Sequence, residues 1–253
     1  IDPNLTGGQL WEPKNYDGTF DGPMPLKRGL AKSKNMISIR ILEAIGPPFA
    51  QGLVSRFGFE AAKHPPFLTM ALGAGAVTPL QMASGYGVFA NGGYLVAPRL
   101  IERITDYRGR VLQDSPTHKP DESMRVIDAR NAYVMTDLLQ EVTRSGTAAK
   151  AQGTLKRNDI YGKTGTTNDS MDAWFAGWHP SLVAVVWIGY DTPRKLGDKE
   201  TGGGLALPVW IEYMQYALKA LQPQKSIAKA PEGLINSGGE WVYEEYAHGA
   251  GVT

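Results

Sequence analysis

Three strand-like segments lie close together between residues 160 and 190, and they restrict the possible folds more than any other feature of this sequence. The segments span residues 160–167, 173–178 and 182–190, and only a few residues separate each from the next. Connections this short cannot form a crossover, so consecutive strands must pair antiparallel. The third segment is an unbroken run of β-branched, apolar and aromatic residues, which is typical of a strand inside a sheet. The sequence therefore predicts an antiparallel sheet with residues 182–190 as a central strand.

Helical patterns on both sides of the strands predict that helices flank this sheet. Thr78 followed by Pro79 is a typical helix start, and Asp128 is placed to cap a long amphipathic helix. The expected helices cover residues 36–44, 47–57, 79–90, 129–144 and 205–221, the last after a linker at residues 202–204. The other segments predict a loop over residues 1–28, a hairpin over 94–112 with its turn at 106–109, and a tail or the start of a small module over 223–253. Residues 1–222 are expected to form one domain.

The composition excludes several classes of protein. The 253-residue chain has 26 basic and 25 acidic side chains, so its net charge of +1 provides no basic field, and no nucleic-acid partner is expected. The absence of cysteine excludes disulfides, and the four histidines are scattered, so no metal and no cofactor are expected. The longest apolar run, residues 182–190, is too short to span a bilayer. The chain begins with Ile1 rather than methionine, which indicates a fragment whose targeting segment lies upstream.

Gly162-Lys163-Thr164 is the first candidate for chemistry. These residues match the end of a phosphate-binding loop, but Arg157 stands where that motif needs its first glycine. In a strand, Lys163 and Gly165 lie on one face while Thr164 and Thr166 lie on the other. A glycine in a strand allows a ligand to approach the backbone closely. On these residues alone, a solvated surface strand is the simpler interpretation.

A second polar motif, Ser33-Lys34-Asn35, precedes the helix expected at residues 36–44. Either Ser33 or Asn35 could cap that helix if the motif stood alone. Together with Lys163-Thr164-Gly165, the motif resembles the S-x-N and K-T-G signatures of penicillin-binding transpeptidases and serine β-lactamases. The similarity extends over nearly the whole chain and is to the transpeptidase domain of class A penicillin-binding proteins of the 1a type. It is carried by residues 11–16, 30–46, 72–73, 78–83, 89–93, 163–175, 186–189, 231 and 244–246.

The resemblance implies an α+β fold, in which an antiparallel sheet is flanked by helices beside a mostly helical subdomain. It also implies peptidoglycan D,D-transpeptidation, in which a serine attacks one stem peptide, D-Ala is released and a second stem peptide accepts the acyl group. Stem peptides and β-lactam antibiotics are the partners that it implies. By this resemblance Ser33 relays a proton, Asn35 binds an amide group of the substrate, and Lys163 adds positive charge beside them. The residues expected to bind substrate are Thr164, Thr166 and Thr167, and the backbone N–H of Thr166 is expected to form half of the oxyanion hole.

The chain departs from the family at the S-x-x-K motif, which holds the acylated serine and should precede S-x-N. The only S-x-x-K sequence, Ser226 to Lys229, follows the K-T-G strand and lies in the tail, where a solvated linker is the simpler interpretation. The resemblance therefore places the nucleophile in an upstream segment of the same protein, together with a glycosyltransferase domain and a membrane anchor at the periplasmic face of the bacterial inner membrane. This chain alone is expected to be inactive. A D,D-carboxypeptidase, a β-lactamase-like hydrolase and a non-catalytic stem-peptide-binding domain of the same fold remain as alternatives.

Overall fold

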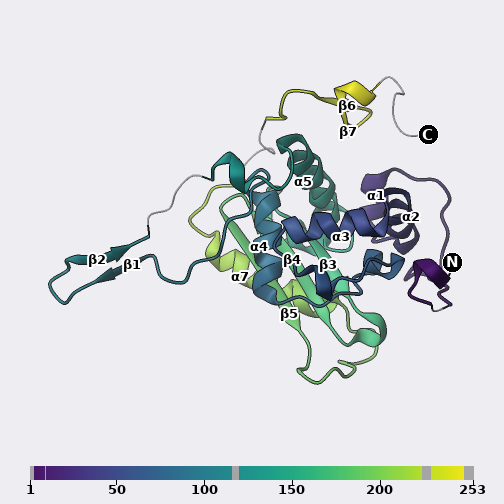
Figure 1. Ribbon diagram of the computed structural model, residues 1–253, viewed down its shortest axis with the longest axis horizontal. Helices are drawn as coiled ribbons and strands as arrows, with labels where there is room; N and C mark the ends of the chain where they lie inside the picture. Colours follow the sequence, from purple (N-terminus) through teal and green to yellow (C-terminus); the bar gives the residue numbers. More distant parts are fainter. Residues whose placement is uncertain (1–2, 9, 116–119, 224–228, 248–253) are drawn as a thin grey trace.

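The predicted strands form an antiparallel sheet in the computed structural model, which describes residues 3–8, 10–115, 120–223 and 229–247. Strands β3 (Tyr161–Thr166), β4 (Ala173–His179) and β5 (Leu182–Ile188) lie in the order β3-β4-β5 (Figure 1). Thr164 pairs with Phe175, which in turn pairs with Val186. The antiparallel pairing predicted from the short connections is confirmed.

Helices surround this sheet. Their bounds are α1 (Leu26–Ala31), α2 (Asn35–Ile45), α3 (Pro47–Arg56), α4 (Pro79–Ala90), α5 (Ala129–Arg144), α6 (Ala149–Leu155) and α7 (Leu207–Ala217). The predictions for α2, α3, α4 and α5 are confirmed, and the side chains of Thr78 and Asp128 cap α4 and α5 as expected.

The sequence did not predict α1 or α6, because six and seven residues are too few to show a helical period. The loop predicted over residues 1–28 is therefore wrong at its end, where α1 begins. The predicted linker at residues 202–204 is also wrong. Gly202–Ala206 instead form one turn of π-helix, and α7 ends at Ala217 rather than at residue 221.

β5 lies at the edge of the sheet, so the central position predicted for residues 182–190 is wrong within the described part of the chain. All seven residues of β5 are nevertheless half-buried. Both α4 and α7 contact this strand, so helices cover its faces. An apolar run indicates that both faces of a strand are covered, but it does not indicate whether strands pair along both edges.

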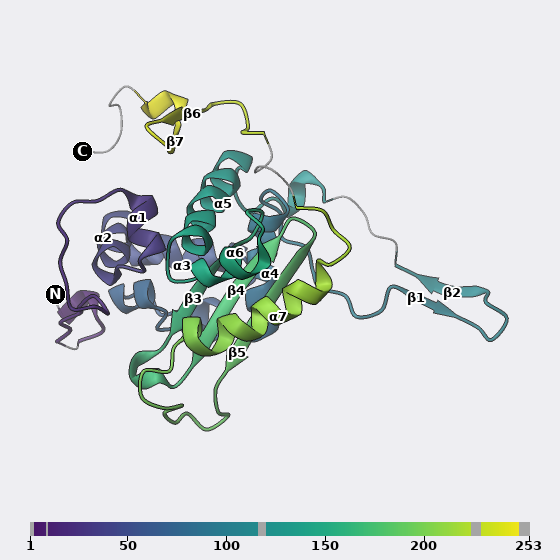
Figure 2. The same ribbon diagram turned by 180° about the vertical axis from the view of Figure 1, so that it is seen from behind.

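The two faces of the sheet are covered by different helices, α4 on one side (Figure 1) and α7 on the other (Figure 2). On the α7 side, the rings of Phe175 and Trp210 meet edge to face with centroids 4.8 Å apart. On the α4 side, Trp178 contacts Tyr86 at 6.0 Å and Phe89 at 6.1 Å between centroids. Alternation along β4 thus directs neighbouring aromatic residues into two different layers.

Helices α2 and α3 form a smaller apolar cluster beside the sheet domain. Ile39 and Leu42 of α2 pack there against Ala50 of α3 and Leu68, which begins the short 3₁₀ turn Leu68–Leu72. This cluster agrees with the helical subdomain that the sequence led us to expect. It also fixes α2, the helix that follows the Ser33-Lys34-Asn35 motif.

Two hairpins complete the fold. β1 (Arg103–Thr105) and β2 (Val111–Asp114) form a ribbon that projects away from the body (Figure 1). Its turn at residues 106–109 is confirmed, but the predicted hairpin over 94–112 is too long, because residues 95–102 form no strand and Tyr94 makes only an isolated bridge to Arg125. β6 (Leu234–Ser237) and β7 (Glu240–Tyr243) pack on α5, where the Trp241 and Tyr133 rings meet at 5.2 Å.

Candidate active site

Strand β3 forms one wall of a cleft. Its first residues, Tyr161 and Gly162, are buried, and its last residue, Thr166, is exposed, so the strand runs outward from the core. Lys163 lies on the α4 side with its partner Ala176. Thr164 lies on the opposite side, where its hydroxyl oxygen is 2.7 Å from that of Thr147. The alternation predicted for this segment is confirmed.

The connection between α1 and α2 forms the facing wall. Ser33 has a φ of 55°, a left-handed conformation that costs a non-glycine residue about 1–2 kcal/mol. Its hydroxyl accepts a hydrogen bond from Lys163 Nζ at 2.7 Å. The interpretation that Ser33 or Asn35 caps the following helix is wrong, because α2 begins without a side-chain cap. The Asn35 amide instead donates to the Lys14 carbonyl at 2.8 Å. The S-x-N and K-T-G motifs, which lie 130 residues apart in the chain, therefore meet.

The ammonium group of Lys163 lies where these two walls meet. Burial lowers the pKa of Lys163 from 10.5 to about 8, because desolvation disfavours the protonated form. The same nitrogen also donates to the carbonyl oxygen of Thr164 at 3.1 Å. At neutral pH this lysine is still mostly protonated and donates to Ser33, but its proton is easier to remove than that of a surface lysine.

The contacts at the outer end of β3 hold its threonines in place. A Cβ at Gly202 would lie 2.4 Å from the carbonyl oxygen of Gly165, so only glycine fits there. This close approach lets the Gly202 N–H donate to Thr166 Oγ1 at 3.0 Å. Thr167 Oγ1 accepts a hydrogen bond from the backbone N–H of Asp172 at 2.7 Å. Both threonine side chains are therefore held at the mouth of the cleft.

The cleft between the two walls has a volume of about 550 Å³ and brings most of the predicted residues together. Of the predicted residues, its lining includes Ser33, Asn35, Thr164, Thr166 and Thr167. Lys163 reaches it through the hydrogen bond to Ser33. The other lining residues were not predicted as site residues, and they are Tyr16, Lys32, Thr147, Asn168, Asp169, Ser170, Thr201 and Gly203. Most of these lie in irregular segments, where no periodicity marks a residue as part of a site.

Thr147 reaches the cleft because the end of α5 lies against the end of α1. The Thr147 N–H donates to the Ala31 carbonyl at 3.0 Å. A Cβ on Gly146 would lie 2.3 Å from that carbonyl oxygen, so glycine is needed for this approach. The only sequence signal for Thr147 is this preceding glycine at a helix end.

Comparison with known protein families gives a match over most of the chain. Residues 2–215 match the transpeptidase family described as the penicillin binding protein transpeptidase domain. This chain belongs to that family. The antiparallel sheet with flanking helices that the sequence predicted is the penicillin-binding transpeptidase fold.

Relatives carry this transpeptidase domain within longer proteins. Penicillin-binding protein 1A of Neisseria flavescens is 50% identical over 234 residues, which cover 92% of this chain and 29% of that protein. The crystal structure of penicillin-binding protein 1A from Haemophilus influenzae has a TM-score of 0.85 at 34% identity and covers 93% of this chain and 42% of its own. The PonA1 protein from Mycobacterium tuberculosis in complex with penicillin V, at 23% identity, shares the fold with a TM-score of 0.70 over 87% of this chain and 62% of its own. The chain thus spans less than a third of the Neisseria relative.

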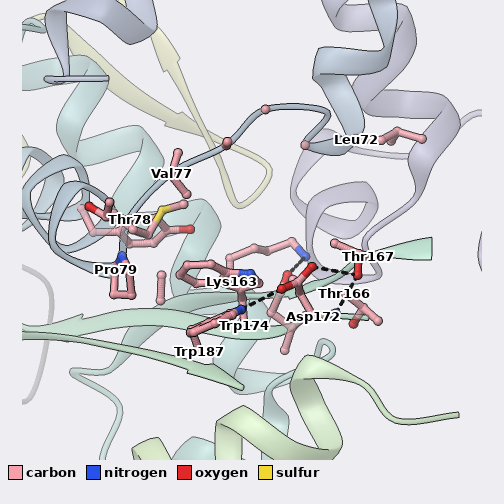
Figure 3. Close-up of a pocket in the computed structure, with 18 residues that line it drawn as sticks. Leu72, Val77, Thr78, Pro79, Lys163, Thr166, Thr167, Asp172, Trp174 and Trp187 are labelled. Carbon is pink, nitrogen blue, oxygen red and sulfur yellow. Dashed lines mark hydrogen bonds between the residues drawn. The ribbon is translucent and has the colours of Figure 1, made fainter. Parts of the chain in front are cut away.

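A second cavity, of about 540 Å³, lies on the α4 side of the transpeptidase sheet. Figure 3 shows it between the segment from Leu72 to Pro79 and the rings of Trp174 and Trp187. Lys163 is part of its lining, and most of the other lining side chains are apolar. This cavity therefore places apolar surface beside the ammonium group that hydrogen-bonds Ser33.

Three other expectations concern metals, membranes and the tail. Among the described residues, no group of three histidine, aspartate or glutamate side chains is arranged to hold a metal ion. No helix within those residues has the length and apolar character needed to cross a bilayer. Ser226 of the S-x-x-K sequence lies at 224–228, outside the described residues.

Proposed function

We propose that this domain catalyses peptidoglycan D,D-transpeptidation by serine acyl transfer, joining two stem peptides with release of D-Ala. The hydrogen bond from Lys163 Nζ to Ser33 Oγ is the observation that carries this proposal. It places a cation of lowered pKa beside a hydroxyl in a cleft lined by threonines. Proton transfer and the binding of an anionic substrate need groups of these kinds. The family match and the Neisseria and Haemophilus relatives support the same function.

Each site residue predicted from the sequence has a role in this proposal. Ser33 relays a proton to the leaving amine. Lys163 supplies a positive charge that keeps the amine of the lysine in the upstream S-x-x-K motif neutral, because like charges repel. Asn35 hydrogen-bonds an amide of the stem peptide. The terminal carboxylate of the substrate binds the hydroxyls of Thr164, Thr166 and Thr167, while the Thr166 N–H stabilises the oxyanion.

We propose that the acylated serine belongs to an upstream segment of the same protein, whose side chains fill the cavity on the α4 side. The apolar lining of that cavity and its position beside Lys163 support this arrangement. β5 supports it as well, because a strand of seven uncharged residues with no described partner on its outer edge is suited to pair with a further strand. A serine that the upstream segment placed in this cavity would lie next to Lys163 and its hydrogen-bond partner Ser33.

The rest of our proposal concerns the whole protein. We propose that β-lactam antibiotics acylate the same serine, in keeping with the penicillin V complex of the structurally similar mycobacterial protein. We also propose that the upstream region holds a glycosyltransferase domain and an anchor, which place this domain at the periplasmic face of the bacterial inner membrane. In this view residues 1–222 are the C-terminal portion of the transpeptidase domain and residues 223–253 are a tail or the start of a small module.

Labelling with a fluorescent penicillin tests the function. The full-length protein and this 253-residue chain are treated side by side, separated on a denaturing gel and analysed by intact mass. We expect label on the full-length protein and none on this chain. Label on this chain would place a nucleophile within it, with Ser226 the first candidate, and would contradict the upstream serine.

A second assay separates transpeptidation from its alternatives. The full-length protein is given a stem peptide with and without an amine acceptor, and the released D-Ala and the products are measured. We expect cross-linked product to exceed the hydrolysed peptide when the acceptor is present. Hydrolysis alone would indicate a carboxypeptidase or a β-lactamase-like hydrolase, and a protein that takes neither label nor substrate would indicate a non-catalytic binding domain.

A further inference from the structure

Ser33 occupies a position in a helix-ending turn where glycine is the usual residue. The Ser33 N–H donates to the Leu30 carbonyl and the Lys34 N–H donates to the Gly29 carbonyl, each at 3.0 Å. This pair of bonds is the Schellman motif, in which the residue after the helix cap adopts a left-handed conformation. Ser33 has that conformation, with a φ of 55°. A serine at this position needs contacts elsewhere in the structure to maintain it.

The next residue, Lys34, makes contacts of the kind needed to maintain the left-handed conformation of Ser33. Its side chain is buried, and its ammonium group lies 2.6 Å from Asp17 and 2.8 Å from Asp21. It also donates to Thr19 Oγ1 at 3.0 Å. The hydrogen bond from Lys34 lowers the pKa of Asp17 to about 2, so this carboxylate stays charged over the whole neutral range. One buried cation is thus held by two carboxylates from a segment that precedes α1.

The segment that carries these carboxylates, residues 14–21, also contacts the start of α2. Asn15 Oδ1 accepts from the Met36 N–H at 3.2 Å, and Asn15 Nδ2 donates to the Thr19 carbonyl at 2.6 Å. Tyr16, from the same segment, lines the cleft with Ser33. Residues 14–21 therefore form a clasp around the turn that presents Ser33.

We propose that Lys34 is a positioning residue, which holds the left-handed turn at Ser33 through its ion pairs with Asp17 and Asp21 and so keeps Ser33 Oγ beside Lys163. This inference rests on the proposed acyl-transfer function. Lys34 does not line the active-site cleft, so it acts through Ser33 rather than on the substrate. Without the cation, two carboxylates repel each other, the clasp loses its anchor, and residue 33 relaxes out of the left-handed region.

The kinetics of acylation by a fluorescent penicillin in the full-length protein test this role. We expect Lys34→Met to lower the acylation rate constant by about 100-fold, the loss typical of a misplacement of about 1 Å, with little change in the dissociation constant of the initial complex. Lys34→Arg should recover most of the rate, because a guanidinium can bind both carboxylates. Asp17→Asn and Asp21→Asn each leave one ion pair and should give intermediate losses.

Lys27→Met is the matched control. Lys27 lies on α1 and pairs with Asp137 at 2.6 Å, but it does not line the cleft. We expect this variant to acylate within about twofold of the wild type, because its ion pair is largely buried but lies outside the cleft. Equal losses in Lys27→Met and Lys34→Met would show that Lys34 is an ordinary structural ion pair and would overturn the inference.

Melting temperatures provide a test that does not depend on activity. Lys34→Met is compared in the wild-type and Ser33→Gly backgrounds, because glycine adopts the left-handed conformation without strain. If Lys34 holds the turn, its loss lets Ser33 relax and releases strain, so the melting temperature should fall less in the wild-type background than in the Ser33→Gly background, where no strain is released. Equal shifts in both backgrounds would contradict the inference. Failure of the wild-type protein to react with penicillin would instead contradict the proposed function and leave this thermal result as the test of the turn.

Discussion

The two faces of the β3-β4-β5 sheet differ in how completely they are packed. On the α7 side Phe175, Trp210 and Met214 are fully buried, and a Cβ on Gly177 would lie only 3.0 Å from the Trp210 ring. The α4 side holds a cavity of about 540 Å³, with Lys163 in its lining. We call the packed α7 side the closed face and the α4 side, which holds the cavity, the open face. The comparison indicates that the closed face stabilises the sheet, while the open face carries the charge on which the proposed chemistry depends.

Removing the charge from the open face should have the largest effect. We expect Lys163→Met to lower penicillin acylation of the full-length protein by about 10²- to 10⁴-fold, the usual range for loss of a group that assists proton transfer. Lys163→Arg should keep part of the rate because it retains the cation. Lys150→Met on the exposed surface of α6 serves as the control. Retention of a third or more of the rate in Lys163→Met would mean that the open face does not need this charge.

The closed face should control stability. Phe175→Ala is expected to lower the free energy of unfolding of this chain by about 3–5 kcal/mol, measured by guanidinium titration, because it opens a hole among fully buried aromatic rings. Trp174→Ala is the matched change on the other face, at the adjacent position of β4. Because Trp174 lines a cavity, its loss should cost less than half as much. Equal costs would show that the two faces are packed alike.

The sequence predicts the direction of residues within a strand better than the contacts between distant segments. Alternation within residues 163–167 is enough to place Lys163 and Thr164 on opposite sides, because successive residues of a strand point to opposite faces. The partners of Lys34 and Thr147 could not be predicted, since they depend on contacts between segments that the sequence pattern does not relate. The edge position of β5 was missed for a different reason, as its apolar run reflects coverage by α4 and α7.

The pH dependence of stability should also report on the open face. The pKa of Lys163 in the folded chain is about 8, below the 10.5 of an unburied lysine, so between these values the unfolded chain binds more protons than the folded one. Stability contributed by this group therefore rises with pH across that window, by at most about 1.4 kcal/mol per pH unit for one proton. Guanidinium titrations at a series of pH values measure this slope. It should disappear in Lys163→Met, and an unchanged slope in that variant would assign it to other groups.

The smallest effect should come from Thr147, which tests whether the side of β3 opposite the cavity also contributes to function. Thr147→Val keeps the shape of the side chain but removes the hydroxyl that lies 2.7 Å from the Thr164 hydroxyl. Loss of one such hydrogen bond costs about 0.5–1.5 kcal/mol, so acylation should fall by about two- to tenfold as Thr164 loses its orientation. Thr136→Val is the control, because its hydroxyl donates to the Ala132 carbonyl within α5. If both variants acylate at the same rate, substrate binding does not depend on the threonine pair, and the open face alone carries the function.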